Sequence, residues 1–244
     1  MIRWAAPGPY EVVFSTRVGG VSDGPYASLN LGRKTGDAVE RVDENRAILC
    51  ERAGADVDKL TMNRQTHSAR VNRGEAGVLG GAGDGLWTDE SGVPLLAVTA
   101  DCVPIALARS NGDRPALCVL HAGRIGILGG IVEAGVASLG GAVAAAIGPA
   151  IGPCCYEVGE EVAAPYRTRF GAAVMRGRKL DLWRAVELSL LQAGVRSIER
   201  VDLCTACSPN LFFSHRRDGK PRGVQGVLAY VACAAARELR ADQG

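Results

Sequence analysis

P-L-L-A-V-T-A-D-C-V-P at residues 94–104 and A-L-C-V-L-H-A-G-R-I-G at residues 116–126 decide the fold class. Each stretch opens with a continuous apolar run, at 94–99 and 116–120. Such runs are typical of β-strands that are covered on both faces. Further short strands are predicted at 12–14, 143–147 and 227–231.

Three segments have the apolar spacing of amphipathic helices. They are residues 37–53, 159–170 and 181–193. Pro165 is expected to interrupt the second, because proline cannot donate a backbone hydrogen bond. Asp181 can cap the third. Strands mixed with helices predict an α/β or α+β sandwich.

The chain has 244 residues, of which 47% are hydrophobic, enough for a large buried core. It contains no repeat, low-complexity tract or linker, so we expect one domain over 1–244. Glycine-rich patches at 80–85 and 123–141 lie between apolar segments and are interpreted as active loops.

Charge and hydropathy exclude several classes of partner. The net charge is +2, which favours neither nucleic acid nor an acidic membrane surface. The first residues contain no long apolar segment, and no apolar run approaches the ~20 residues that span a bilayer. We therefore expect a cytoplasmic protein with small-molecule partners, and the sequence leaves its oligomeric state open.

Three side chains are candidate metal ligands. Cys102 follows the strand at 94–99, and His121 follows the strand at 116–120. If these strands are neighbours, their ends bring the two side chains together, and His67 in Q-T-H-S-A-R-V could join them from a third segment.

Two imidazoles and one thiolate suit Zn²⁺, and three protein ligands leave the open position that a catalytic zinc site needs. Such an ion lowers the pKa of bound water. The neighbouring Asp101 could orient a ligand or move protons.

Other interpretations of these residues stay open. Cys102 could be a small buried side chain, or it could form a metal-free nucleophile pair with His121. A rival metal site could use Cys204 and Cys207, in the C-x-x-C spacing, together with the adjacent pair at 154–155. One C-x-x-C is weak evidence, however, and an adjacent pair is a poor chelate for one tetrahedral ion. The third histidine, His215, is interpreted as structural or close to the substrate.

Several motifs in order resemble the laccase-domain family, also called YfiH-like, which bears the old label polyphenol oxidase and is now described as a purine nucleoside phosphorylase. The motifs are F-S-T-R-V-G-G-V-S-D-G-P-Y-A-S-L-N-L-G, Q-T-H-S-A-R-V, T-A-D-C-V-P-I, H-A-G-R-I-G, A-I-G-P-A-I-G-P-C-C-Y-E-V-G, D-L-W and C-T-A-C-S-P-N-L-F-F-S-H-R-R-D-G. The match covers about residues 14–231, which is almost the whole chain.

The resemblance implies a layered α/β sandwich with mixed sheets flanked by helices, and a zinc ion held by His67, Cys102 and His121. It also implies phosphorolysis of adenosine, inosine, guanosine and methylthioadenosine, and deamination of adenosine. Phosphate would need cationic groups, for which Arg17 and Arg124 are candidates.

Asn30 and Gln65 are candidates for contacts to the base or the sugar. For Arg17, as a solvated loop cation, and for Asn30, as a turn residue, a purely structural role is equally open.

Two positions depart from the family pattern. Arg124 and Ile125 stand where Trp-Arg is usual, and Val224 follows Gly223 where arginine is usual. Arg124 or Arg222 could compensate from one residue away; otherwise phosphate affinity should fall and deamination could outlast phosphorolysis.

Three alternative functions remain at this stage. They are a copper-dependent polyphenol oxidase, a hydrolase that edits peptidoglycan precursors with Cys102 as nucleophile, and a binding protein without turnover. The three histidines of this chain argue against a multicopper oxidase, which needs many.

Overall fold

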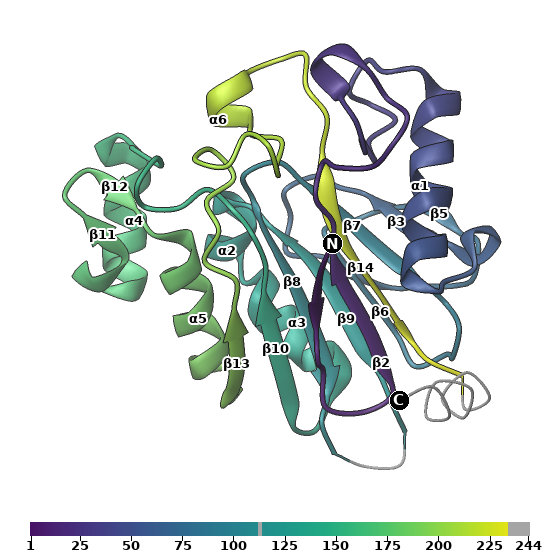
Figure 1. The fold of residues 1–244 in the computed structure, drawn as a ribbon. Helices are drawn as coiled ribbons and strands as arrows, with labels where there is room; N and C mark the ends of the chain where they lie inside the picture. Colours follow the sequence, from purple (N-terminus) through teal and green to yellow (C-terminus); the bar gives the residue numbers. More distant parts are fainter. Residues whose placement is uncertain (112–113, 234–244) are drawn as a thin grey trace.

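Two six-stranded mixed sheets lie face to face at the centre of the computed structural model, which describes residues 1–111 and 114–233 (Figure 1). The first sheet has the strand order β1 (Ile2–Trp4), β2 (Tyr10–Phe14), β14 (Gln225–Val231), β7 (Leu95–Thr99), β3 (Thr61–Arg64) and β5 (Leu79–Ala82). The second has the order β13 (Ser197–Arg200), β10 (Val143–Ile147), β8 (Val103–Arg109), β9 (Leu117–Ala122), β6 (Gly85–Thr88) and β4 (Val71–Arg73). A separate two-stranded ribbon pairs β11 (Met175–Arg176) with β12 (Lys179–Leu180).

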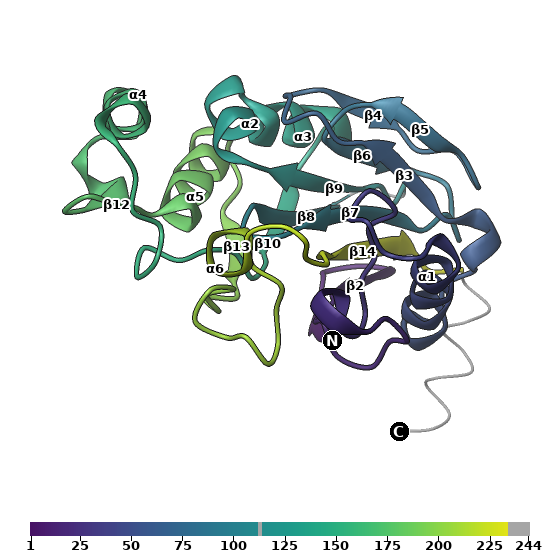
Figure 2. The same cartoon turned by 90° about the horizontal axis from the view of Figure 1, so that it is seen from above.

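Helices cover the outer faces of both sheets, so the molecule has four layers. Helix α1 (Val39–Ala53) lies on the first sheet, and α2 (Arg124–Gly129), α3 (Ile131–Leu139) and α5 (Leu182–Gln192) lie on the opposite side, against the second sheet (Figure 2). The remaining helices are α4 (Glu160–Phe170), α6 (His215–Asp218) and the 3₁₀ turns η1 (Gly24–Tyr26), η2 (Val57–Lys59) and η3 (Ala172–Val174). This arrangement confirms the predicted sandwich of mixed sheets flanked by helices.

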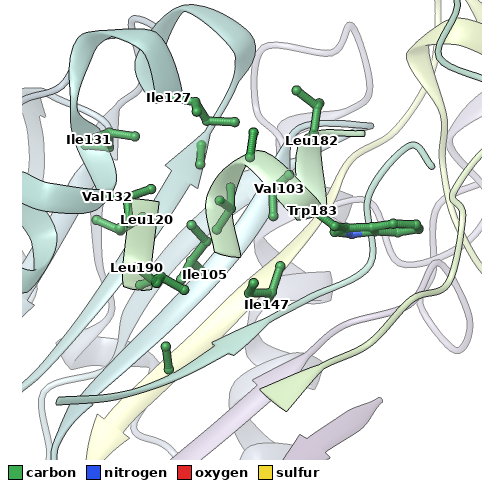
Figure 3. Close-up of a cluster of buried hydrophobic side chains, with 14 of the residues drawn as sticks. Val103, Ile105, Leu120, Ile127, Ile131, Val132, Ile147, Leu182, Trp183 and Leu190 are labelled. Carbon is green, nitrogen blue, oxygen red and sulfur yellow. The ribbon is translucent and has the colours of Figure 1, made fainter. Parts of the chain in front are cut away.

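The central strands are buried on both faces, which explains their continuous apolar sequence. In β8, Val103 and Ile105 pack against helices, whereas Ala106 and Ala108 face the first sheet. Figure 3 shows the helical side of this core, where Val103, Ile105 and Leu120 lie among side chains of α2, α3 and α5. In β8 and the neighbouring β10, alanines face the first sheet, where large side chains such as Phe14 fill the space, and larger aliphatic residues lie under the helices.

Two predictions of local structure were wrong. The patch at 80–85 spans strands β5 and β6, and the patch at 123–141 forms α2 and α3 rather than a loop. The glycine at 135 allows close packing there, because a Cβ on Gly135 would lie 2.8 Å from Leu120 Cδ1 and 3.0 Å from Leu107 Cδ1. A local pattern cannot distinguish a glycine that packs from one that bends the chain.

Pro165 does not interrupt its helix, since α4 runs unbroken from Glu160 to Phe170. The two aromatic residues that follow the proline, Tyr166 and Phe170, are both buried. Their packing outweighs the one backbone hydrogen bond that proline removes. Within the part of the chain that the structure describes, no helix combines the length and apolar character needed to cross a bilayer.

We predict that Gly135→Ala destabilises the protein, although alanine is the better helix former by about 1 kcal/mol. The new methyl group would collide with buried Leu120, and overpacking costs about 1–3 kcal/mol. In a Leu120→Ala background the same change should instead stabilise the protein by about 1 kcal/mol. Denaturant unfolding of the four proteins measures both effects.

Gly129→Ala is the matched control, because a Cβ at that position makes only an ordinary 3.5 Å contact. It should not destabilise the protein in either background. If Gly135→Ala stabilises the protein in which Leu120 is intact, the close approach of α3 to the sheet is not a constraint.

Candidate metal centre

Two imidazoles and one thiol lie together at one end of the second sheet. The ligand atoms of His67, Cys102 and His121 all lie within 4.8 Å of one another. The two imidazole rings meet edge to face, with their centroids 4.9 Å apart. These are the three residues that the sequence singled out, and they form a donor set suited to one metal ion.

The route that brings Cys102 to His121 differs from the predicted one. The strand before Cys102 is β7, which belongs to the first sheet, whereas His121 lies within β9 of the second sheet. Cys102 instead immediately precedes β8, which runs antiparallel to β9 so that Val103 lies opposite Ala122. The start of one strand therefore meets the end of its neighbour, and no parallel pair of strand ends is involved.

Asp84 shapes the loop that carries His67. Its carboxylate accepts hydrogen bonds from the backbone N–H groups of Thr66 at 3.1 Å, His67 at 3.0 Å and Ser68 at 2.6 Å. The Ser68 hydroxyl adds a fourth bond at 2.8 Å. His67 has a φ of 59°, a left-handed conformation that is unfavourable for a non-glycine residue. The bonds to Asp84 offset this strain and hold the imidazole in place.

The same carboxylate orients the second histidine. Asp84 Oδ1 lies 2.8 Å from His121 Nδ1, and the backbone carbonyl of Asp84 accepts the His121 N–H at 2.8 Å. Burial alone raises the pKa of Asp84, but the bonds from His121, Ser68 and Thr66 bring it far below its usual range. Since Nδ1 faces this carboxylate, Nε2 of His121 is the nitrogen left for a metal.

The thiol and His121 form a charged pair when no metal is bound. Burial raises the pKa of Cys102, but the neighbouring His121 and His67 lower it to about 6. Burial lowers the pKa of His121, but Cys102 and Asp84 raise it to about 9. At neutral pH the pair is therefore thiolate and imidazolium, and a metal ion must displace the imidazolium proton to bind.

Gly123 leaves the space that the cluster needs. A Cβ at this position would lie 2.9 Å from His67 Cδ2 and 3.2 Å from Cys102 Sγ. Every other residue type would press against two of the three ligands, so the glycine permits their close approach.

A cavity of about 450 Å³ opens beside the centre, a size typical of small-molecule sites. It is lined by His67, Ala100, Asp101, Cys102, Arg124, Ile125, Ile151, Tyr156, Leu182, His215 and Arg216. His67 is exposed, Cys102 is half-buried and His121 is buried, so one side of the ligand cluster faces the cavity. Within the part of the chain that the structure describes, the Arg124 guanidinium makes no hydrogen bond or ion pair, so this cation is available to a ligand.

Asp101 lies in the cavity wall but does not orient a ligand as predicted. Its carboxylate accepts a hydrogen bond from the Thr205 hydroxyl at 2.6 Å and another from the Arg216 backbone N–H at 2.7 Å. Its φ of 84° is strained for a non-glycine residue. Asp101 therefore ties the loop of Thr205 to the start of α6, and Asp84 takes the orienting role that was one of the two predicted for Asp101; the other, moving protons, stays a prediction.

Two other predicted substrate residues bond to backbone instead. Arg17 donates to the carbonyls of Ala27 at 2.7 Å and Pro209 at 3.0 Å, and its guanidinium lies 4.4 Å from the centroid of the Phe213 ring. Asn30 is fully buried, and its side-chain oxygen accepts the Gly32 N–H at 3.1 Å. Neither residue lines the cavity at the centre.

Gln65 is also engaged with backbone. Its amide donates to the Val98 carbonyl at 2.8 Å and accepts the Val98 N–H at 2.9 Å. It lines a separate cavity of about 400 Å³ beside β3. The three polar residues thus support the loops around the centre rather than the space beside it.

Sequence reasoning missed Asp84, Tyr156 and Arg216. Asp84 stands in G-A-G-D-G, where an aspartate is typical of a turn, and nothing local links it to residues 17 positions earlier and 37 later. The guanidinium of Arg216 lies 5.1 Å from the centroid of the Tyr156 ring. Tyr156 comes from the loop after β10 and Arg216 from α6, and only the tertiary structure brings the two side by side.

Comparisons of the sequence and of the structure with known proteins all identify the same family. The family described as multi-copper polyphenol oxidoreductase laccase matches residues 11–232. The purine nucleoside phosphorylase of Corynebacterium glutamicum is 35% identical over 234 residues, which cover 90% of this chain and 94% of that protein. The purine nucleoside phosphorylase YlmD of Geobacillus stearothermophilus is 36% identical over 245 residues, covering 89% and 88%. The crystal structure of a Neisseria meningitidis protein of the DUF152 family has a TM-score of 0.88 at 30% identity and covers 95% of this chain and 99% of its own.

We predict that Asp84→Asn lowers zinc affinity by roughly 10- to 100-fold, the usual cost of losing a residue that orients a ligand. An amide cannot stabilise the orientation of His121 and the His67 loop as the carboxylate does. Competition with a chromophoric chelator measures the affinity. Thr205→Val removes the hydrogen bond to Asp101 but none of the contacts of Asp84, and it should leave the affinity unchanged. Equal affinities of Asp84→Asn and the wild type would contradict this account of the site.

We also predict that zinc binding strengthens as the pH rises from 6 to 9. The His121 pKa of about 9 means that the imidazole holds a proton over most of this range, and the metal must displace it. The logarithm of the affinity should therefore increase by about one per pH unit in the middle of the range and less steeply as the pH approaches 9. Below pH 6 the slope should be steeper, because Cys102, with a pKa of about 6, must then lose a proton as well.

Titration with zinc in weakly buffered solution, with the released protons counted, checks this pH dependence directly. An affinity that is flat between pH 6 and 9 would show that no imidazolium has to be deprotonated.

Proposed function

The chain belongs to the laccase-domain family described as multi-copper polyphenol oxidoreductase laccase, and from this premise we propose that it is a zinc-dependent purine nucleoside phosphorylase. The observation that carries the proposal is the cluster of His67, Cys102 and His121 at the mouth of a nucleoside-sized cavity. Relatives at about one-third identity, matched along nearly the whole chain, bear the name purine nucleoside phosphorylase. The substrates we propose are adenosine, inosine, guanosine and methylthioadenosine.

The donor set favours zinc over copper. Imidazole and thiolate together suit Zn²⁺, and one exposed side leaves the open position of a catalytic site. Blue-copper centres combine two histidines and one cysteine with a long axial ligand, usually methionine. No methionine is among the residues that line this cavity. When bound, Zn²⁺ would supply Lewis-acid chemistry and a lowered pKa for bound water.

Arginines beside the cavity are suited to hold phosphate. Arg124 lines the cavity together with Ile125, which occupies the position where the family usually has arginine. Arg222 has a buried Nε atom without a hydrogen-bond partner in the described part of the chain. Burial lowers the pKa of Arg222, whereas the charges of Asp101, Asp218 and Cys102 raise it, so this guanidinium lies within electrostatic reach of the centre. In this proposal both displaced arginines supply the charge that the usual positions lack.

Apolar and aromatic side chains are suited to hold the purine. Ile125 lines the cavity and is 54% exposed, so its apolar side chain is available to contact a base. Tyr156 is half-buried in the same wall and offers a ring for stacking. The base would then lie near the metal centre, with the ribose C1′ exposed to phosphate held by the arginines.

Phosphorolysis also needs a proton for the departing purine. Both oxygens of Asp101 already accept hydrogen bonds, so this residue is suited to positioning the loops rather than to donating. His215 lines the cavity and is exposed, and an imidazole can donate a proton near neutral pH. We assign it the role of proton donor to the leaving base.

Adenosine deamination is the second activity we propose for the same centre. It needs the metal cluster and a group that moves protons at the purine, but it needs no phosphate. Phosphorolysis therefore depends on the arginines that hold phosphate, whereas deamination does not.

The decisive experiment incubates metal-replete protein with adenosine or inosine, with and without phosphate, and separates the products by chromatography. We expect phosphate-dependent release of free base from inosine, and formation of inosine from adenosine without phosphate. Arg124→Met and Arg222→Met should each raise the KM for phosphate at least tenfold, because a charge-assisted contact is lost. Deamination should change little in both variants.

Arg64→Met is the matched control, since Arg64 is exposed and lines the separate cavity beside β3. Release of neither product would overturn the proposed function. Stoichiometric copper with oxygen uptake on a phenol would identify an oxidase. Hydrolysis of peptidoglycan precursors that survives chelation but not blocking of Cys102 would identify a cysteine hydrolase. Nucleoside-induced stabilisation without turnover would identify a binding protein.

A further inference from the structure

Four cysteines from two loops lie together, apart from the metal centre. Cys154 and Cys155 follow β10, and Cys204 and Cys207 follow β13. Because β10 and β13 are parallel neighbours, both loops leave the same end of the second sheet. A further bridge between Ala150 and Cys204 continues the pairing beyond the strands. The sheet thus brings two pairs of thiols together from about 50 residues apart in the chain.

The four sulfur atoms are spaced as the ligands of one ion would be. All four lie within 4.8 Å of one another. The Cys207 sulfur is 3.5 Å from that of Cys154 and 3.3 Å from that of Cys155. Sulfur ligands of a tetrahedral zinc site, each about 2.3 Å from the ion, are about 3.8 Å apart. All four thiols are free, and only small shifts separate this cluster from that geometry.

The adjacent cysteines converge in the structure, although neighbouring residues are usually a poor chelate. They lie in a turn in which the Cys155 N–H donates to the Gly152 carbonyl at 3.0 Å, and both sulfurs point to Cys207. The Cys204 sulfur accepts the Gly152 N–H at 3.3 Å. Such a bond stabilises an anionic sulfur. The geometry of this turn therefore allows both adjacent cysteines to bind one ion, although their sequence spacing argued against it.

We propose that Cys154, Cys155, Cys204 and Cys207 bind a second Zn²⁺ ion in a closed structural site. Four thiolates complete the tetrahedral coordination of zinc and leave no open position, so this ion would not take part in catalysis. The proposal is independent of the reaction proposed for the cavity, since it uses none of the same ligands.

Cations surround the cluster and suit its charge. Four thiolates around Zn²⁺ carry a net charge of −2. Lys179 donates to the Cys154 carbonyl at 2.6 Å. Arg217 donates to the carbonyls of Thr205 at 2.7 Å and Ala206 at 3.3 Å, which lie between the two cysteines of the C-x-x-C turn. Cationic side chains are thus hydrogen-bonded to the backbone of both loops that supply the thiolates, where their charge stabilises the anionic cluster.

The ion would fasten one wall of the cavity. Tyr156 follows Cys155 directly and lines the cavity. Thr205 follows Cys204 directly and bonds to Asp101. With the two loops joined by metal, the aromatic ring and the carboxylate keep their relative positions. The zinc would therefore act on the cavity through the loops and not through contact with substrate.

Metal analysis of variants tests the proposal. Wild-type protein purified without added metal should contain two zinc ions per chain, and Cys207→Ser and Cys155→Ser should each contain one. His121→Ala should also contain one, and the double variant His121→Ala with Cys207→Ser should contain none. Cys233→Ser is the matched control, because Cys233 is exposed like Cys207 but lies outside the cluster, and it should keep two. Cobalt substitution of His121→Ala should give the intense absorption of a tetrathiolate site.

A second measurement uses the wild-type protein, so it tests the proposal even if the variants fail to fold. Cys154, Cys207 and Cys233 are exposed, so all three should react with an alkylating reagent if no metal is bound. With zinc in place we expect rapid labelling of Cys233 alone, and labelling of Cys154 and Cys207 only after a chelator is added. Immediate labelling of all three in metal-replete protein would overturn the proposal. Full zinc content in Cys207→Ser, a disulfide in the purified protein, or iron in place of zinc would also overturn it.

Discussion

The buried carboxylate of Asp84 is the constraint on which the metal centre depends. It accepts hydrogen bonds from three successive backbone N–H groups, at Thr66, His67 and Ser68, and it faces the ring of His121. A buried anion is costly unless it is hydrogen-bonded, and these bonds offset that cost. They also compensate the left-handed backbone at His67. One side chain thus orders a loop that has no regular structure and aims two imidazoles at a common point.

The layered fold supplies the rigid frame for this arrangement. Sheet residues alternate between the central core and the helical layers, so both faces of the middle strands are covered. The antiparallel pair β8 and β9 places Cys102 beside His121 with a fixed register. Because the register of a strand buried on both faces cannot slip without exposing its core residues, the thiol and the imidazole keep their spacing.

In the function that we propose, the cavity would hold phosphate and a purine side by side. Arg124 and Ile125 enter it from one end of α2, and Tyr156 and Arg216 form another part of its wall. The wall is built from loops, and loops need fastening if a site is to keep its shape. Asp101 provides one fastening through Thr205 and the backbone of Arg216. The thiol cluster lies where it could provide a second fastening, since it joins the loop of Thr205 to the loop that carries Tyr156.

The sequence by itself determined the fold class, the central strands β7, β9, β10 and β14, the capped helix after Asp181 and the three candidate metal ligands, but it missed the central strand β8. These features follow from local patterns, since apolar runs, capping residues and scarce histidines can be recognised within a few positions. Only the tertiary structure decided which strands are neighbours, and hence that Cys102 meets His121 through β8 rather than through β7. It also decided the role of Asp84 and turned Arg17, Asn30 and Gln65 towards backbone groups. Strand partners and hydrogen-bond acceptors are chosen by burial and by contacts far apart in the chain, and a polar residue in a loop carries no local sign of which partner it will find.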